Sequence, residues 1–298
     1  MIVRTTATAP GGIAARRSDG SGVRRLSVHI GLLCATGAWV LVCWATPWTA
    51  AAVVIHGIAL SALFCAAHES VHRTAFRSRR LNDIVAAACG VVLLLPSRWF
   101  RLFHAAHHRY TQDPVRDPEL AGWKPATGAG IVLHASGLLY WWAMARIIVT
   151  LSLGHAADAF LPPGHRRRVI AQARASLVVY AAVLVASIAG RSLRAVQLWV
   201  LPAVAGQPFL RAFLLAEHTG CPQVPDVLAS TRTTRTNGLV RLLTWNMSFH
   251  AEHHAQPQVP FHQLPALHGA IGSQVQVIGR GYVRTYASLQ RSRWASRA

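Results

Sequence analysis

Four long runs of apolar residues constrain the fold of this chain more than any other feature. They occupy residues 27–45, 51–67, 169–189 and 193–215. A helix that crosses a bilayer needs about 20 mostly apolar residues, and backbone inside lipid must satisfy its own hydrogen bonds. Short turns at 46–48 and 190–192 join the runs in pairs. The sequence therefore predicts an all-α integral membrane protein with four transmembrane helices in two hairpins.

Two weaker apolar runs, residues 84–95 and 130–153, lie between these hairpins. Basic clusters at 73–80, 98–109 and 166–168 flank them, and arginine-rich loops stay on the cytoplasmic side of a membrane. If all three clusters lie on that side, each weak run begins and ends there, in the interface or as a re-entrant segment. We expect four crossings of the inner or plasma membrane, with interfacial helices, a cytoplasmic helical cap and both termini in the cytoplasm.

The composition bounds the remaining classes of protein. Only 13% of the residues are charged, against about a quarter in soluble domains, and the net charge is +20. The arginines flank apolar runs and are not interleaved with polar surface, which argues against nucleic-acid binding. The five cysteines are scattered without a C-x-x-C pair, which excludes a disulfide framework or zinc ribbon. We expect a disordered basic cytoplasmic arm (1–26), a membrane domain (27–268) and a basic cytoplasmic tail (269–298).

Eight of the sixteen histidines fall into ordered spacings. One pair is four residues apart, and two triplets have the i, i+3, i+4 pattern, so each set shares one face of a helix. A ninth histidine follows the fourth apolar run, on the same predicted side. Neutral imidazole suits iron, copper, zinc or nickel, and nine ligands exceed the needs of one metal, so two metals are implied. The candidate ligands are His68, His72, His104, His107, His108, His218, His250, His253 and His254.

Carboxylates gather beside these histidines. A ligating histidine usually donates its second ring N–H to a carboxylate or carbonyl, which fixes the ring. A helix-surface or capping role is an equal alternative for each acidic residue. The candidates for this supporting shell are Glu69, Asp113, Asp117, Glu217, Asn246 and Glu252.

Two other readings of the histidines are weaker. Residues 68–72 match the H-E-x-x-H zinc protease pattern, but a protease with Glu69 as its base leaves both triplets unexplained. A metal transporter would need an ion path of ionisable side chains inside its spans. The predicted spans offer Arg174, His29 and His56, and we interpret these two histidines as packing residues.

The three histidine motifs, in this order, resemble the histidine boxes of the membrane fatty acid desaturase/hydroxylase superfamily. The flanks at 107–119 and 246–265 are also similar, and His218 matches the extra histidine that the family places ahead of its third box. The resemblance implies four transmembrane helices, a cytoplasmic cap and a non-haem di-iron centre with O2 as co-substrate. It also implies C–H chemistry in the membrane, most often desaturation of a hydrophobic acyl or lipid-like substrate.

The chain departs from the family pattern in two places. Some relatives carry, four residues before the extra histidine, an asparagine that holds a metal-bound water. This chain has Leu214 there, and Asn246 is a substitute by proximity only. No fused cytochrome b5 module is recognisable, so the resemblance implies a separate electron donor such as ferredoxin or cytochrome b5 with its reductase. The motifs do not choose between a desaturase and a hydroxylase or ketolase acting on a carotenoid or another hydrophobic metabolite.

Overall fold

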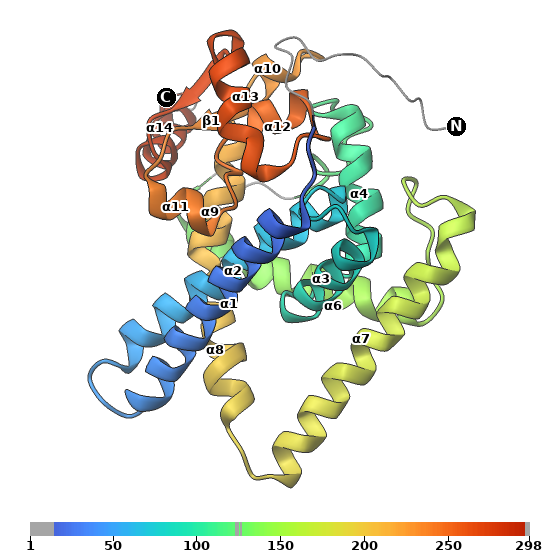
Figure 1. Ribbon diagram of the computed structural model, residues 1–298, viewed down its shortest axis with the longest axis vertical. Coiled ribbons are helices and arrows are strands. Elements are labelled where there is room, and N and C mark those ends of the chain that lie inside the picture. Colours follow the sequence, from blue (N-terminus) through green and yellow to red (C-terminus); the bar gives the residue numbers. More distant parts are fainter. Residues whose placement is uncertain (1–14, 123–124, 126, 296–298) are drawn as a thin grey trace.

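The computed structural model describes residues 15–122, 125 and 127–295 of the chain (Figure 1). This part is mostly helical, and its two short strands, β1 (Arg232–Thr234) and β2 (Val277–Gly279), pair in parallel. Residues 1–14 of the predicted arm lie outside the described residues. Residues 19–26 of that arm form the first turns of a helix that Ser18 caps through its side chain.

Within the described residues, four helical segments are long and apolar enough to cross a membrane, as predicted. Much of their apolar surface faces outward: only 17% of the apolar window of α7 is buried inside the protein. Such a surface is stable in lipid and not in water. The segments are α1 (Asp19–Val42), α2 (Thr49–His72), α7 (Pro163–Ala189) and the run of η1 (Val196–Val200), α8 (Leu201–Ala205) and α9 (Gln207–His218).

The two weaker apolar runs form bent helix pairs. The axes of α3 (Arg79–Val92) and α4 (Ser97–Tyr110) differ by 102°, and those of α5 (Gly128–Ala135) and α6 (Leu138–Ser152) by 51°. Each pair either turns back or forms one broken span, so length and composition alone allow up to six crossings.

The end of α3 carries an unusual set of caps. The last carbonyls of a helix lack helical partners, and lipid offers no donors for them. Side chains from three other segments supply the donors: Tyr140 OH to Leu93 O at 2.9 Å, Tyr180 OH to Val91 O at 3.1 Å and Trp199 Nε1 to Val92 O at 2.8 Å. These bonds allow the chain to turn between α3 and α4 in apolar surroundings.

The helix α2 lies at the centre of the membrane-spanning part and packs closely against α8. A Cβ atom on Gly57 would lie 2.2 Å from Pro202 O, and one on Gly206 would lie 2.0 Å from Gly57 O. The two backbones are therefore in direct contact, which only glycine permits.

The two histidines inside the spans make structural hydrogen bonds. His29 Nε2 lies 2.9 Å from Ala59 O. His56 Nδ1 lies 2.8 Å from Thr36 Oγ1, and His56 Nε2 lies 3.0 Å from Leu198 O in the π-helical turn η1. These partners agree with the interpretation of both residues as packing histidines.

A group of short elements covers one end of the spans, at the top of Figure 1. It includes segments from the predicted tail: β2 pairs with β1, and α14 packs on α9, where Phe213 and Tyr282 have ring centres 5.4 Å apart. Of the predicted hairpins, α1 and α2 lie side by side, whereas α7 and α8 diverge from their connecting turn (Figure 1). The remaining elements are α10 (Val227–Ser230), α11 (Gly238–Leu243), α12 (His250–Ala255), η2 (Phe261–Gln263), α13 (Leu264–Ile271), η3 (Gly272–Gln274) and α14 (Tyr282–Ala295).

Candidate metal centre

All nine predicted histidines meet where the spans join the covering elements. The final turns of α2, α4 and α9 end at this junction, and α12 approaches them from the covering side. Because helical positions three and four apart share a face, each motif presents its rings in one direction.

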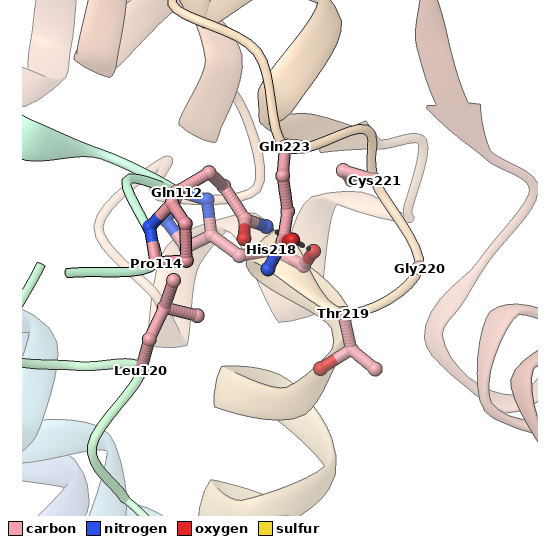
Figure 2. Close-up of a pocket in the computed structure, with 8 residues that line it drawn as sticks. All are labelled: Gln112, Pro114, Leu120, His218, Thr219, Gly220, Cys221 and Gln223. Carbon is pink, nitrogen blue, oxygen red and sulfur yellow. Dashed lines mark hydrogen bonds between the residues drawn. The ribbon is translucent and has the colours of Figure 1, made fainter.

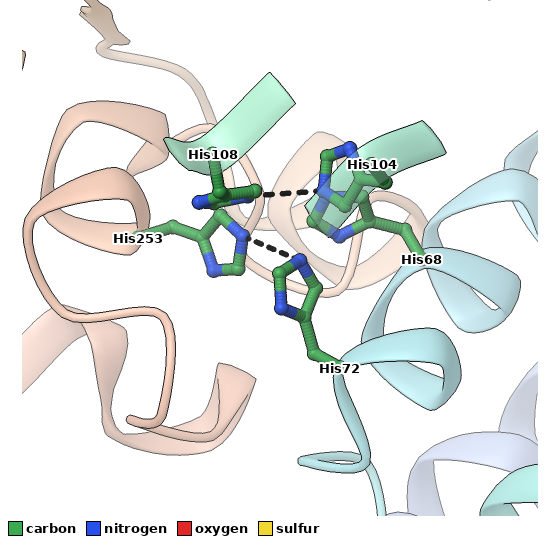
Figure 3. A group of neighbouring side chains, drawn as sticks. All are labelled: His68, His72, His104, His108 and His253. Carbon is green, nitrogen blue, oxygen red and sulfur yellow. Dashed lines mark hydrogen bonds between the residues drawn. The ribbon is translucent and has the colours of Figure 1, made fainter. Parts of the chain in front are cut away.

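The first cluster combines five histidines from three helices. One ring nitrogen from each lies within 4.8 Å of the others. The Nε2 atoms of His72 and His253 are 3.2 Å apart, and those of His104 and His108 are 3.0 Å apart (Figure 3). Both ring nitrogens of His68 are buried without a hydrogen-bond partner among the described residues.

The second cluster lies directly beside the first and contains four histidines. His107, His218 and His254 bring ring nitrogens within 4.8 Å of one another. His250 joins them, since its Nε2 lies 3.1 Å from Nε2 of His218 and 3.1 Å from Nε2 of His254. His107 and His218 are 3.2 Å apart through the same atoms.

The far sides of the rings in the second cluster face hydrogen-bond acceptors. His107 Nδ1 lies 3.0 Å from Asp117 Oδ1 in a fully buried pair, and 3.2 Å from Glu119 Oε2. His218 Nδ1 lies 3.3 Å from the carbonyl oxygen of Ser230. A neutral imidazole carries one N–H, so these acceptors place the hydrogen on Nδ1 in both rings.

The third ring follows the same rule through a hydroxyl group. Thr111 donates its hydroxyl hydrogen to the carbonyl of His107 at 2.9 Å, so its oxygen accepts from His254 Nδ1 at 3.2 Å. His250 Nδ1 lies 3.4 Å from Glu217 Oε1, which also favours a hydrogen on Nδ1.

The Nε2 atoms are consequently left without hydrogens and point at one another. Bare nitrogen lone pairs 3.1 to 3.2 Å apart repel, and a cation between them removes the repulsion. Two nitrogens each about 2.1 Å from one ion, at angles of about 90° to 110°, would lie roughly 3.0 to 3.4 Å apart. The spacing in both clusters fits a metal ion held by neutral imidazoles.

Burial keeps these rings in the ligating form. Desolvation, reinforced by neighbouring histidines, holds the pKa of His250, His253 and His254 well below the ordinary value. They are therefore neutral at neutral pH, with a lone pair available to a metal.

Two of the predicted supporting carboxylates connect the histidine helices to the covering elements. Glu69 is fully buried, and its Oε2 accepts from Thr74 Oγ1 at 2.8 Å and from the backbone N–H of Phe261 at 3.2 Å. Glu252, inside the third motif, hydrogen-bonds both Thr233 and His268. Neither carboxylate touches a ligand ring, but each fixes a helix that carries such rings.

The other two polar candidates lie away from the rings. Asp113 pairs with Arg116 at 2.6 Å on the surface, and that guanidinium lowers the pKa of the Asp113 carboxyl. Asn246 donates to the carbonyl of Phe261 at 2.9 Å. The structure brings neither residue into contact with a histidine of the clusters.

Several partners were missed by the sequence reasoning. Glu119 and Ser230 contact His107 and His218, and Thr111 contacts His254. Thr111 lies one helical turn after His107, which is a spacing that the sequence could have indicated. The carbonyl of Ser230 carries no sequence signal, because any residue has a backbone carbonyl.

A pocket of about 430 Å³ adjoins the second cluster (Figure 2). His218 forms part of its wall, and Gln112 Nε2 donates to the carbonyl of His218 at 2.7 Å. Its other lining residues are Pro114, Leu120, Thr219, Gly220, Cys221 and Gln223. His218 is the one histidine of the clusters among these lining residues.

The fold and the site define a helical membrane protein with two adjacent histidine clusters. Residues 27–286 match the family described as Fatty acid desaturase. The chain therefore belongs to the fatty acid desaturase family, as the histidine motifs predicted.

Characterised relatives are similar at low identity over most of the chain. An sn-1 oleoyl-lipid 12-desaturase of Picosynechococcus is 24% identical over 72% of this chain and 66% of its own length. A dihydrorhizobitoxine desaturase of Bradyrhizobium elkanii is 26% identical over 80% of this chain and 70% of its own length. A sphingolipid delta(4)-desaturase of Komagataella phaffii is 26% identical over 73% of this chain and 60% of its own length. The aligned part spans about two thirds of the first of these relatives.

Proposed function

We propose that this protein is an O2-dependent membrane oxidoreductase that desaturates an acyl chain at a non-haem di-iron centre. The observation that carries the proposal is the pair of adjacent histidine clusters, in which ring nitrogens of nine histidines converge. The family match and the desaturase names of the relatives support the same activity.

We assign two metal positions to this set of donors. The first cluster would hold one ion through His68, His72, His104, His108 and His253, and the second would hold another through His107, His218, His250 and His254. Two iron ions, when bound, would supply with O2 and external electrons the oxidising power to remove hydrogen from an unactivated C–H bond.

The chain's own residues prepare this site in three ways. Asp117, the Ser230 carbonyl and Thr111 keep the ring hydrogens on Nδ1, so that each Nε2 faces the metal. Burial excludes bulk water from the histidines, which protects a strong oxidant from side reactions. Through their hydrogen bonds to neighbouring elements, Glu69 and Glu252 fix the positions of the helices that carry the first and third motifs.

The proposed substrate is a hydrophobic acyl or lipid-like molecule that enters from the membrane. The relatives are named for an oleoyl lipid, a sphingolipid and dihydrorhizobitoxine, so their names agree on desaturation and differ in the substrate. We assign the electrons to a separate donor of the ferredoxin or cytochrome b5 type.

We further propose that the clusters, the covering elements and both termini face the cytoplasm. The support is the distribution of arginines: exposed residues such as Arg77, Arg98 and Arg166 lie near the cluster end of the spans. Anionic lipid headgroups and the positive-inside rule favour this side for them.

The test measures metal and product in the same preparations. Wild-type protein, purified in detergent after expression with iron, should contain about two irons per chain, and His253→Ala should lose a large part of it. His155→Ala, an exposed histidine outside the clusters, is the matched control and should retain wild-type iron.

Product analysis then decides the reaction. Membranes supplied with a reduced ferredoxin should accumulate a new alkene, detected by mass spectrometry, that is absent with His253→Ala. An alcohol or ketone in place of the alkene would identify a hydroxylase or ketolase. A single zinc retained in His253→Ala would contradict the di-iron assignment.

A further inference from the structure

A half-buried arginine lies inside the fourth span, apart from the histidine clusters. Arg211 is in the middle of α9, and its Nε and Nη2 atoms are buried without a hydrogen-bond partner among the described residues. Arg211 is a further ionisable residue of the predicted spans, in addition to Arg174, His29 and His56. An ionisable group at membrane depth is costly and marks a functional site unless it is paired.

The surroundings of Arg211 provide no compensating negative charge. Its guanidinium carbon lies 4.3 Å from the ring centre of Tyr140, a cation–π contact. Among the described residues, no aspartate or glutamate forms an ion pair with it. A cation–π contact is worth much less than the solvation that a buried guanidinium loses, so the charge remains uncompensated.

The two atoms without partners, Nε and Nη2, form one edge of the guanidinium group, and this edge can bind an anion. Nε–H and Nη2–H lie on the same side of a guanidinium and together match the two oxygens of a carboxylate. This protein uses the same edge elsewhere: Arg73 holds Asp83 through Nε and Nη2, at 3.3 and 3.1 Å. Arg211 presents this edge without a carboxylate from the chain.

Arg211 is aligned with the candidate metal centre. His218 follows it by seven residues on the same helix, so both lie on one face, separated by two turns or about 10 Å along the axis. Gln207, four residues earlier, lies on the same face, and its buried Oε1 also lacks a partner among the described residues. Gln207, Arg211 and His218 thus lie along one face of α9, with the apolar Leu214 on the turn between Arg211 and His218.

The break between α5 and α6 covers this face. Gly137 packs so closely on Gln207 that a Cβ atom would lie 2.4 Å from its side chain. Trp141 follows in α6, and its buried Nε1 has no acceptor among the described residues. A further donor therefore lies on the element that faces α9.

We propose that Arg211 binds the carboxylate of a long-chain acid, which is the substrate of the desaturase. The anion occupies the Nε/Nη2 edge, and the apolar chain of the same molecule extends along α9 to the histidine clusters. The inference rests on the proposed function for its reaction, and it narrows the substrate class from acyl lipids in general to free carboxylates.

Binding without turnover tests the proposal. Purified protein in detergent, without reductant, is titrated with palmitate, its methyl ester and hexadecyl phosphate. Wild-type protein should bind palmitate roughly tenfold or more tightly than the ester, since a hydrogen-bonded charge contributes on this scale. Arg211→Gln should bind palmitate and its methyl ester with equal affinity. Arg211→Lys keeps the charge but loses the paired Nε–H and Nη2–H donors, so its preference for palmitate should lie between those of wild type and Arg211→Gln.

A stability measurement separates binding from a structural role. If the positive charge of Arg211 has no compensating partner in the ligand-free protein, its removal should not destabilise the fold. Arg211→Gln should therefore melt at the same temperature as ligand-free wild type or at a higher one. Arg174→Gln, which alters an exposed arginine that donates to the Ser152 carbonyl, is the matched control and should leave the preference for palmitate unchanged.

Each contrary result has a distinct meaning. A retained preference for palmitate in Arg211→Gln would overturn the proposal that Arg211 binds the carboxylate. A melting temperature of ligand-free Arg211→Gln below that of ligand-free wild type would overturn it as well. Tighter binding of hexadecyl phosphate than of palmitate would overturn the carboxylate assignment. Since binding needs neither iron nor electrons, absence of iron and alkene would refute the proposed function and leave this result intact.

Discussion

His107 shows how single residues prepare the candidate metal centre. Its Nε2 faces the second cluster, while its Nδ1 faces the buried carboxylate of Asp117 at 3.0 Å. The same carboxylate accepts from the backbone N–H groups of Gln112 and Glu119 at 2.8 and 2.9 Å. One side chain therefore fixes both the ring and the loop that follows it.

Replacement of Asp117 by asparagine should weaken metal binding. An amide can turn its NH2 group toward His107, which moves the ring hydrogen to Nε2 and blocks that nitrogen as a ligand. Loss of such a partner typically costs 10- to 100-fold in metal affinity, so we expect a decrease of roughly that size. Competition with a chromogenic chelator measures it.

Asp113→Asn is the matched control for this prediction. Asp113 is close in sequence, but it pairs with Arg116 on the surface. Equal metal affinity of the two variants would show that Asp117 has no role in orienting His107.

Residue spacing explains which parts of the site were predictable. The i, i+4 pair and the two i, i+3, i+4 triplets identified eight of the nine histidines, because a helix turns any such pattern into a shared face; His218 was identified by its place after the fourth apolar run. The partners that set the tautomers were not accessible in this way. Thr111 and His254 are 143 residues apart, and only the packing of α12 on α4 brings them together.

At the scale of elements, the crossing of α2 and α8 positions the first histidine motif. Gly57 and Gly206 place the two backbones in contact, and α9 follows α8 directly. The spacing of His68 and His72 from His218 therefore depends on two positions without side chains.

Gly206→Ala should destabilise the protein and lower its metal content. The added Cβ would meet Gly57 O at 2.0 Å, and the helices must separate to accommodate it. Overpacking of this kind costs roughly 1 to 3 kcal/mol. Thermal unfolding in detergent, followed by tryptophan fluorescence, measures the loss.

Gly31→Ala provides the comparison within a span. No atom of the described residues lies within 4 Å of a Cβ at Gly31, and alanine is more stable than glycine in a helix interior. We expect unchanged or slightly higher stability, and an equal loss in both variants would argue against the close crossing.

For the whole molecule, the orientation in the membrane determines where substrate and electrons arrive. The turns after α1 and α7 lie at one end of the spans, and the histidine clusters lie at the other (Figure 1). With arginines gathered near the clusters, the electron donor should meet the protein on the cytoplasmic side.

Cysteine labelling of spheroplasts tests this orientation. In a background with the five native cysteines replaced by serine, a membrane-impermeant maleimide should label Thr46→Cys and Arg194→Cys from outside. Arg77→Cys and Arg166→Cys should react only after the membrane is opened. The reverse pattern would place the clusters outside the cytoplasm and refute the assignment.

The sequence by itself determined the features that depend on local periodicity. Four apolar runs predicted the four segments that are long and apolar enough to span a membrane, and the histidine spacings indicated the candidate ligands and the family. Both follow because a helix converts spacing along the chain into a face in space, and because lipid requires long uninterrupted apolar segments.

Only the tertiary structure decided how these features combine. It divided nine histidines into clusters of five and four, provided hydrogen-bond acceptors for rings of the second cluster, and left Arg211 without a counter-charge among the described residues. It also bent the weaker runs and capped the end of α3 with Tyr140, Tyr180 and Trp199. These outcomes depend on contacts between residues far apart in the chain, which packing creates and local sequence patterns do not encode.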